Sequence, residues 1–301
     1  MIPTFPTFKS LELPDKRAVE RLTKVFPAYS DFNFTSLWVW NIKNAVKISK
    51  LNGNLVVLFA DYVTGEPFLS FIGDKKVSAT AFQLLSYAKV HFKQNFLKLI
   101  PEELAPYFSF KDSPFIVHHD RADADYIYLS DHLMTMREWS KNPKGKALRK
   151  YLSTFPEHKV VVAPLSKINK DHYLDVFHKW SLEKHGNHAF DLNEFKAFER
   201  FLGLADTHIV FVSLYVGDEL AGFSAYELLP KHYAVAHFSK AHTSVYPGVY
   251  EILNWEEGKV MHAKGVKFLN WEQDLGIPGL RHAKEKYRPY FLLKKIMVTL
   301  P

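Results

Sequence analysis

The sequence predicts an α+β protein of two domains, each a mixed, mostly antiparallel sheet flanked by helices. The chain has 301 residues, 47% of them hydrophobic, which is enough to bury two cores. Strand-length apolar runs alternate with amphipathic helical segments along the whole chain. The order helix, hairpin, strand, helix, strand occurs twice, as expected of a duplicated domain. We place the boundary near residue 155, which gives domains 1–155 and 156–301.

The elements of the first half follow from periodicity and turn signals. Alternating apolar residues flank Asn52-Gly53, a strong hairpin signal, and predict a hairpin over Val46–Ala60. The aromatic segment Phe34–Trp40 is expected in the core. The other predicted elements are helices over Asp15–Phe26, Val77–His91 and Pro101–Tyr107, and strands over Phe68–Ile72, Phe96–Ile100, Phe115–His118 and Tyr126–Leu129.

The second half repeats this order. A hairpin is predicted through Gly217-Asp218, with glycine at the first central position of the turn. Its strands are Ile209–Val216 and Leu220–Leu229. The other predicted elements are helices over Asn169–Lys184, Asp191–Leu204, Gly248–Lys264 and Gly279–Lys286, and strands over Tyr233–Ser239, Val266–Leu269 and Tyr290–Val298.

Composition excludes several classes of site. The chain has no cysteine, which rules out disulfides, thiolate metal sites and a cysteine nucleophile. His-Glu-x-x-His, Gly-x-Ser-x-Gly, phosphate-loop and dinucleotide motifs are absent, and we expect no metal site. The N-terminus does not resemble a secretory signal, and no apolar run approaches the roughly 20 residues of a spanning helix. We therefore expect a cytoplasmic protein, with peripheral membrane association left open.

The candidate active site lies in the segment 268–289, where a short strand runs into a Gly/Pro-rich turn and a basic helix. Polar side chains at strand ends lie at the sheet edge, where sites in such folds tend to form. Arg281 and Lys284 share a helical face because they are three residues apart, and they are expected to oppose Glu272 and Asp274. The alternative is a surface turn whose charges pair only with each other in water.

The motif Asn-x-Glu-x-Asp-Leu-Gly-x-x-Gly-Leu-Arg-x-Ala-Lys-x-x-Tyr-x-Pro, at Asn270 to Pro289, resembles the closing motif of one family. That family is the soluble catalytic region of lysylphosphatidylglycerol synthases and their stand-alone relatives. Phe34–Trp40 and Lys144–Lys150 lie where similar segments lie in that family. The resemblance implies two fused acetyltransferase-like (GNAT) domains that take an aminoacyl group from transfer RNA. It leaves the acceptor open, either a phosphatidylglycerol-like headgroup or a small amine or hydroxyl compound.

Residue roles follow from what such a transfer needs. An aminoacyl ester is already activated, so placement, a proton route and donors for the oxyanion suffice. We expect Glu272 and Asp274 to hold ammonium groups or accept the proton, and Arg281 and Lys284 to meet phosphate or ribose groups. The expected lining of the substrate pocket consists of His237, Ser239, Glu251, Asn254, Asn270 and Tyr287.

A basic segment, 136–155, joins the two halves. The net charge is 39 − 32 = +7, which favours polyanionic partners. We expect the helix beginning at Lys144 to contact a phosphate backbone. Its candidate nucleic-acid-binding residues are Lys144, Lys146, Arg149 and Lys150. The alternative is a solvated linker helix.

The loop 241–250 bears on the donor. Enzymes of this fold that use coenzyme A hold its pyrophosphate with an Arg/Gln-x-x-Gly-x-Gly/Ala loop, whose backbone N–H groups face the phosphates. Here the loop has a single glycine and the bulky Tyr246. We therefore expect no bound cofactor and prefer charged tRNA as co-substrate. Two alternatives stay open: an acyl-coenzyme A N-acyltransferase with an unusual loop, and a non-catalytic module that binds tRNA or anionic headgroups.

Overall fold

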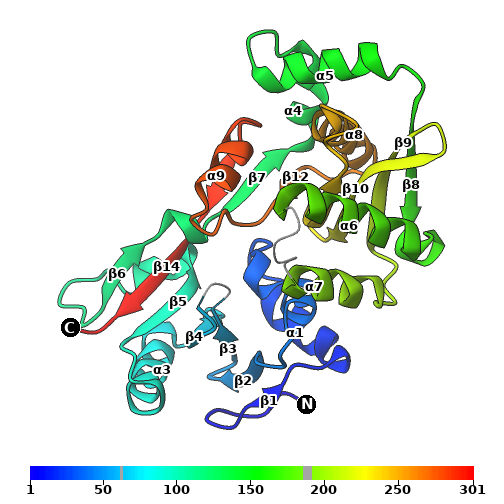
Figure 1. Cartoon of the computed structure of the whole chain (residues 1–301). Coiled ribbons are helices and arrows are strands. Elements are labelled where there is room, and N and C mark those ends of the chain that lie inside the picture. The colour runs from blue at the N-terminus through cyan, green and yellow to red at the C-terminus, as the bar shows by residue number, and fades with distance from the viewer. Residues whose placement is uncertain (62–63, 186–191) are drawn as a thin grey trace. The chain divides into compact units, whose positions relative to one another are not determined.

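The computed structural model describes residues 1–61, 64–185 and 192–301. They form two compact units, the first comprising Met1–Asp125 with Leu293–Pro301, and the second Tyr126–Leu292. Each unit has sheets covered by helices, so the predicted α+β class is confirmed (Figure 1). In the part of the chain that the structure describes, no helix is long and apolar enough to cross a membrane.

The first unit contains two sheets. Their strand orders are β1-β2-β3-β4 and β5-β14-β6, and Figure 1 shows β14 between β5 and β6. The buried face of α3 packs into the core of this unit. The strands are β1 (Lys9–Ser10), β2 (Lys47–Leu51), β3 (Asn54–Ala60), β4 (Pro67–Ile72), β5 (Phe96–Pro101), β6 (Ile116–His119) and β14 (Lys295–Thr299), and the helices are α1 (Lys16–Thr23), α2 (Phe34–Val39) and α3 (Val77–Phe92).

The second unit contains one sheet of order β13-β7-β12-β11-β10-β9-β8. The strands are β7 (Asp125–Leu129), β8 (His158–Pro164), β9 (Ile209–Val216), β10 (Glu219–Leu229), β11 (Tyr233–Ala241), β12 (Phe268–Asn270) and β13 (Phe291–Leu293). The helices are α4 (Ser130–Met134), α5 (Pro143–Thr154), α6 (Lys170–His185), α7 (Leu192–Leu202), α8 (Val249–Ala263) and α9 (Pro278–Glu285). The buried face of α8 packs on the aliphatic and aromatic side chains of β9, β10 and β11.

The predicted repeat is present. The series β1, α1, α2, β2, β3, β4, α3, β5 in the first unit matches β8, α6, α7, β9, β10, β11, α8, β12 in the second. Both predicted hairpins form, and Asn52 and Gly53 take the positive φ angles of 54° and 89° that a primed turn requires. The sequence did not reveal β8, because its half-exposed residues show no clean alternation. Asp191, the predicted start of a helix, lies outside the described residues.

The division of the chain differs from the predicted boundary near residue 155. Residues 126–155 belong to the second unit, because β7 pairs with β12 and both α4 and α5 pack on α8. The prediction of one closing strand over Tyr290–Val298 is wrong. The apolar run is broken at Lys294 into β13, in the sheet of the second unit, and β14, in a sheet of the first. An apolar run in the sequence does not show whether its residues form one strand or are divided between two sheets.

A buried ion cluster anchors β14 within the first unit. Lys295 is 1% exposed, and its Nζ lies 2.6 Å from Oδ1 of Asp125 and in contact with Asp31. Burial by itself disfavours the ammonium, but the two carboxylates outweigh it and raise the pKa of Lys295 above its ordinary value. The last strand is therefore held by charge as well as by pairing.

Candidate functional site

The sheet of the second unit opens between two parallel strands. β11 and β12 pair over only three positions, from Tyr233 opposite Phe268 to Val235 opposite Asn270. β12 then ends, while β11 continues to Ala241 beside β10. We call this divergence the fork. The predicted closing motif starts at the fork, at Asn270, and is thus placed where the parallel strands separate.

His237 occupies a β-bulge at the fork. The pairing of β10 with β11 passes from Ala225 opposite Phe238 to Tyr226 opposite Ala236, which makes His237 the extra residue of β11. Bulges of this kind redirect a side chain and are frequent beside active sites. The imidazole is fully buried, with Nε2 3.3 Å from Oε2 of Glu227 and Nδ1 3.8 Å from Oε1 of Glu272.

This arrangement joins two predicted site residues to one that the sequence did not reveal. His237 and Glu272 come together from β11 and from the loop after β12, 35 positions apart in the chain. Glu227 lies on β10 and is 2% exposed. The available sequence signal was a carboxylate within a mostly apolar strand, Leu220–Leu229. Its partner, His237, depends on the register of the hairpin, which the sequence does not show.

Glu272 is held in an uncommon backbone conformation. Its φ is +57°, in the left-handed region that side-chain-bearing residues seldom occupy. Hydrogen bonds to its backbone hold the loop in place. The side-chain oxygen of Asn270 accepts from the backbone N–H of Glu272 at 2.6 Å. Lys284 Nζ donates to the carbonyl oxygens of Trp271 and Gln273, each at 2.6 Å. The Glu272 side chain itself keeps 25% exposure, so it is accessible to a substrate.

Asp274 and Arg281 form the second anchor of this loop. Arg281 donates from Nε and a terminal nitrogen to the two oxygens of the buried Asp274, at 2.7 and 3.0 Å. Tyr126 donates its hydroxyl to Asp274 Oδ2 at 2.7 Å. Burial opposes the ionised form, but these hydrogen bonds outweigh it and hold the pKa of Asp274 below its ordinary value. Arg281 thus pairs with Asp274, while Lys284 donates to the backbone carbonyls of the loop.

Three predicted pocket residues meet a predicted nucleic-acid residue beside α8. Glu251 Oε1 accepts from Lys144 Nζ at 2.7 Å and from the Tyr287 hydroxyl at 3.4 Å. Lys144 Nζ also lies 4.5 Å from the centre of the Tyr287 ring. Burial first, and then the charge of Glu251, raises the pKa of Tyr287, whose hydroxyl also interacts with Asn254. Lys144 is therefore engaged within its own unit.

The remaining predicted basic residues lie on the surface of α5. Lys146 and Lys150 are exposed. Arg149 donates to the backbone carbonyl of Arg137 at 2.8 Å and fastens α5 to the preceding turn. Of the four residues predicted to contact a phosphate backbone, Lys146 and Lys150 are the most exposed.

A polar network lies between the sheet and α8. Ser239 accepts a hydrogen bond from Ser224 at 2.7 Å across β10 and β11. Tyr226 donates to the carboxyl group of Glu257 and accepts from Trp271 Nε1 at 3.0 Å. Complete burial raises the pKa of Glu257 to about 7. Ser239 was predicted, whereas Glu257 was not, because its helical position is that of an ordinary surface residue.

The loop before α8 is occupied by a carboxylate from α6. Glu183 accepts from the backbone N–H and the hydroxyl of Thr243 at 2.9 and 2.7 Å. It also accepts from the backbone N–H and the hydroxyl of Ser244, at 3.2 and 2.6 Å, and lies 2.9 Å from His242 Nε2. The N–H groups that would face a pyrophosphate in coenzyme A enzymes are thus already bonded.

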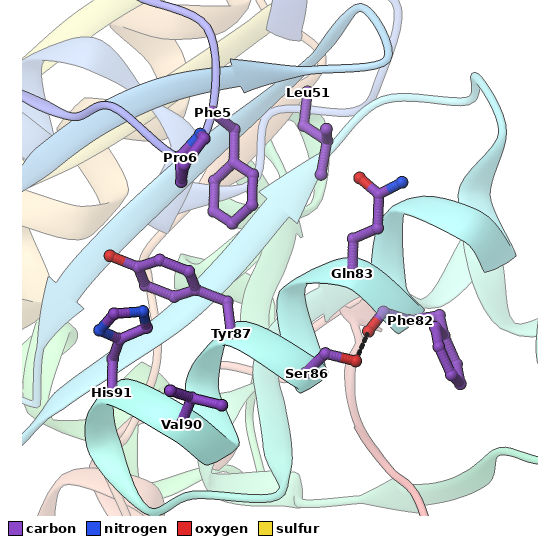
Figure 2. A pocket seen from close by; sticks show the side chains of 9 residues that line it. All are labelled: Phe5, Pro6, Leu51, Phe82, Gln83, Ser86, Tyr87, Val90 and His91. Carbon is purple, nitrogen blue, oxygen red and sulfur yellow. Dashed lines mark hydrogen bonds between the residues drawn. The ribbon is translucent and has the colours of Figure 1, made fainter.

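A shallow apolar groove lies elsewhere, in the first unit. Figure 2 shows aromatic and aliphatic side chains of α3 facing Phe5 and Pro6. No residue predicted for the site lines it. Its lining consists of Phe5, Pro6, Leu51, Phe82, Gln83, Ser86, Tyr87, Val90 and His91.

Comparisons with solved structures agree on the fold. A conserved protein of unknown function from Bacteroides thetaiotaomicron is 24% identical, with a TM-score of 0.79 and 100% coverage of both chains. L-PGS from Bacillus licheniformis is 13% identical, with a TM-score of 0.60 over 96% of this chain and 94% of that one. A protein named FemX is 9% identical, with a TM-score of 0.56 over 98% and 97%. A search of curated protein sequences finds no match.

A family model decides the membership. The model described as phosphatidylglycerol lysyltransferase, C-terminal, matches residues 23–299, which include the fork and the whole closing motif. The two units repeat one order of elements, as expected of the tandem domains that the closing motif implied. This chain belongs to the family of phosphatidylglycerol lysyltransferase C-terminal regions.

Proposed function

We propose that this protein is an aminoacyl-tRNA-dependent aminoacyl transferase that reacts at the fork of the second unit. The observation that carries the proposal is the carboxylate of Glu272, held at the fork by its anchored loop and facing the buried His237. The family, named for lysyl transfer to phosphatidylglycerol, supports a transferase of this kind. The acceptor is a phosphatidylglycerol-like headgroup or a small amine or hydroxyl compound.

The reaction places limited demands on the protein. The acceptor's nitrogen or oxygen attacks the ester carbonyl, a new C–N or C–O bond forms, and the ester bond to the tRNA ribose breaks. The acceptor loses one proton and the ribose oxygen gains one. Glu272 is the accessible base, and a base held in place contributes about 10²–10⁴-fold to such a step. Asp274, Arg281 and Lys284 hold the loop that presents it.

The loop before α8 supports charged tRNA over coenzyme A as donor. A pyrophosphate there would have to displace Glu183 from two backbone N–H groups and two hydroxyls. It would also meet the negative charge of that carboxylate, whose pKa these hydrogen bonds lower against the opposing effect of burial. The exposed Lys146 and Lys150 of α5 are available to a tRNA backbone.

A discharge assay tests the proposal. Purified protein is mixed with total tRNA charged with labelled amino acids, with and without a lipid extract and a small-molecule extract. We expect enzyme-dependent loss of one amino acid from tRNA into an extractable product, and no transfer from acetyl-coenzyme A. Transfer from the thioester without tRNA discharge would instead establish an acyl-coenzyme A enzyme. Salt-sensitive tRNA binding without discharge would establish a binding module.

A further inference from the structure

We propose that Glu227 and His237 form a buried proton relay behind Glu272. In this relay, Glu227 is a positioning residue, and His237 takes up the proton that Glu272 removes from the acceptor. The inference rests on the proposed function; it adds Glu227 to the site and gives His237 a role in proton transfer. The closing motif includes neither Glu227 nor His237, because both residues lie on the preceding hairpin of β10 and β11.

The three side chains form a line from the surface to the interior. Glu272 is 25% exposed, His237 is fully buried, and Glu227 is 2% exposed. Glu272 is therefore the member of the line that a substrate can reach. Glu227 reaches the chemistry through the imidazole, which separates it from Glu272.

The distances fix the direction of the relay. His237 Nε2 lies 3.3 Å from a carboxylate oxygen of Glu227, within hydrogen-bonding distance. In the proposed relay the imidazole proton is on Nε2 and is donated to the carboxylate of Glu227. Nδ1 then faces Oε1 of Glu272 at 3.8 Å and is the nitrogen that accepts the proton in the relay. This gap is short enough to close to a hydrogen bond when a substrate is bound, as catalytic contacts often do.

The proton balance of the step is simple. One proton moves from the acceptor to Glu272 and then to Nδ1 of His237, while Nε2–H stays donated to Glu227. The resulting imidazolium lies between two carboxylates, and the buried charge of Glu227 stabilises it. The same division of roles is known for the buried carboxylate of a serine protease triad. When the ribose hydroxyl leaves, the proton returns along this path, so no co-reactant is needed.

The surroundings of His237 suit this role. Two carboxylates of the described residues lie against it, Glu227 from β10 and Glu272 from the loop after β12. From α7, the ring of Phe201 lies 5.4 Å from the imidazole, centre to centre, and gives the site an apolar wall. Both carboxylates are therefore placed to stabilise the imidazolium that forms when His237 accepts the proton.

Single-turnover transfer over a range of pH tests the relay. Glu227→Gln keeps the shape and removes the charge, and we expect transfer at pH 7 to fall about 10–100-fold while the KM for charged tRNA changes less than about twofold. The acidic limb of the pH profile should move to lower pH, because the imidazole loses its stabilising charge. A merely structural role would lower the rate equally at every pH and leave the midpoint unchanged. The matched control is Glu157→Gln on the exposed surface.

A double variant provides a second readout. His237→Gln and the pair Glu227→Gln/His237→Gln should be equally slow, because Glu227 acts only through His237. Additive losses would overturn the relay. If the wild-type protein discharges tRNA and Glu227→Gln matches it, the relay is wrong and the proposed function stands. If the wild type discharges nothing, the proposed function itself fails.

A measurement on the unaltered protein covers the case in which these variants do not fold. Long-range ¹H–¹⁵N spectra report which ring nitrogen carries the proton in each neutral histidine. We expect the His237 signal at pH 8 to be the Nε2–H form. The Nδ1–H form would overturn the relay, because Nδ1 would then have no lone pair for the proton from Glu272.

Discussion

At the residue scale, most of the charged side chains described in the closing motif stabilise its loop, and Glu272 is the carboxylate that a substrate can reach. Asp274 is saturated by Arg281, Tyr126 and a backbone N–H from Gly276. Lys284 is directed at backbone carbonyls. The backbone N–H of Glu272 donates to Asn270, and the Glu272 side chain keeps 25% exposure. The motif that predicts the site is thus largely a scaffold for a single reactive group.

Replacing Lys284 should expose this scaffolding role. Lys284→Met removes the ammonium that binds the carbonyls of Trp271 and Gln273, so the loop carrying Glu272 loosens. We expect a loss of about 2 kcal/mol in the free energy of unfolding and at least about a tenfold loss of transfer. Lys286→Met, at the C-cap of the same helix, should keep both the stability and the transfer rate. Unimpaired transfer by Lys284→Met, measured with chemical denaturation alongside, would contradict this role.

Glu257 should make stability depend on pH. Burial raises its pKa from 4.5 to about 7, so the folded state binds more protons than the unfolded state between these values. Stability therefore falls as pH rises from about 4.5 to about 7, by about 3 kcal/mol at most. Glu257→Gln should remove this dependence. Denaturation at several pH values checks it, and parallel curves for the two proteins would contradict it.

The sequence predicts the carboxylate that we propose as the base but not its surroundings. Glu272 and His237 are both site residues predicted from the sequence. Glu227 was not, because its partner depends on a bulge that shifts the β10–β11 register by one residue. The charge pattern of its helix predicts that Lys144 contacts nucleic acid. That pattern does not show that Glu251 lies within 2.7 Å of the Lys144 ammonium. Long-range partners depend on register and packing, which local patterns do not encode.

At the element scale, the last strand carries a charge into the core of the first unit. β14 pairs with β5 and β6, and Lys295 reaches the carboxylates of Asp31 and Asp125. The apolar run Tyr290–Val298 predicted a strand, but its division into β13 and β14 depends on two different sheets. The charged Lys294–Lys295 pair within that run was the available sign of the break.

Removing the buried ammonium should destabilise the first unit. Lys295→Met leaves two buried carboxylates without their shared cation, and losing one partner of a buried ion pair costs about 3–5 kcal/mol. Lys294→Met is the matched control, because Lys294 is 56% exposed and pairs only at the surface with Glu102. Its effect should stay within about 0.5 kcal/mol. Equal stability of the two variants in denaturant would refute the anchoring role of Lys295.

At the scale of the whole molecule, the two units have the same order of elements. The first unit is formed by two separate stretches of the chain, and the second by one. Each has the same order of eight elements, of which the sequence pattern predicted the order helix, hairpin, strand, helix, strand but not the first strand, β1 or β8. Their limits were harder to predict, because β7 enters the sheet of the second unit and β14 returns to the first. No composition change marks residue 125, whereas the basic segment after residue 136 resembles a linker.

Fragments should reveal these limits. We expect residues 126–292 to unfold cooperatively, because they retain β7 beside β12 and α4 and α5 on α8. Residues 156–301 lack β7, α4 and α5. They also include β14 without its pairing partners, β5 and β6. That fragment should show no cooperative thermal transition in circular dichroism. A cooperative transition for 156–301 and none for 126–292 would favour the boundary near residue 155.

The measurement that tests the central claim most directly is single-turnover discharge of charged tRNA by the wild type and by Glu272→Gln. We predict that the wild type moves one labelled amino acid into an extractable product. Glu272→Gln should do so about 10²-fold more slowly or less, with unchanged tRNA binding, while Glu157→Gln matches the wild type. Transfer by Glu272→Gln within about threefold of the wild-type rate, well short of the loss expected when a catalytic base is removed, would contradict the account, because its reactive group would then be dispensable.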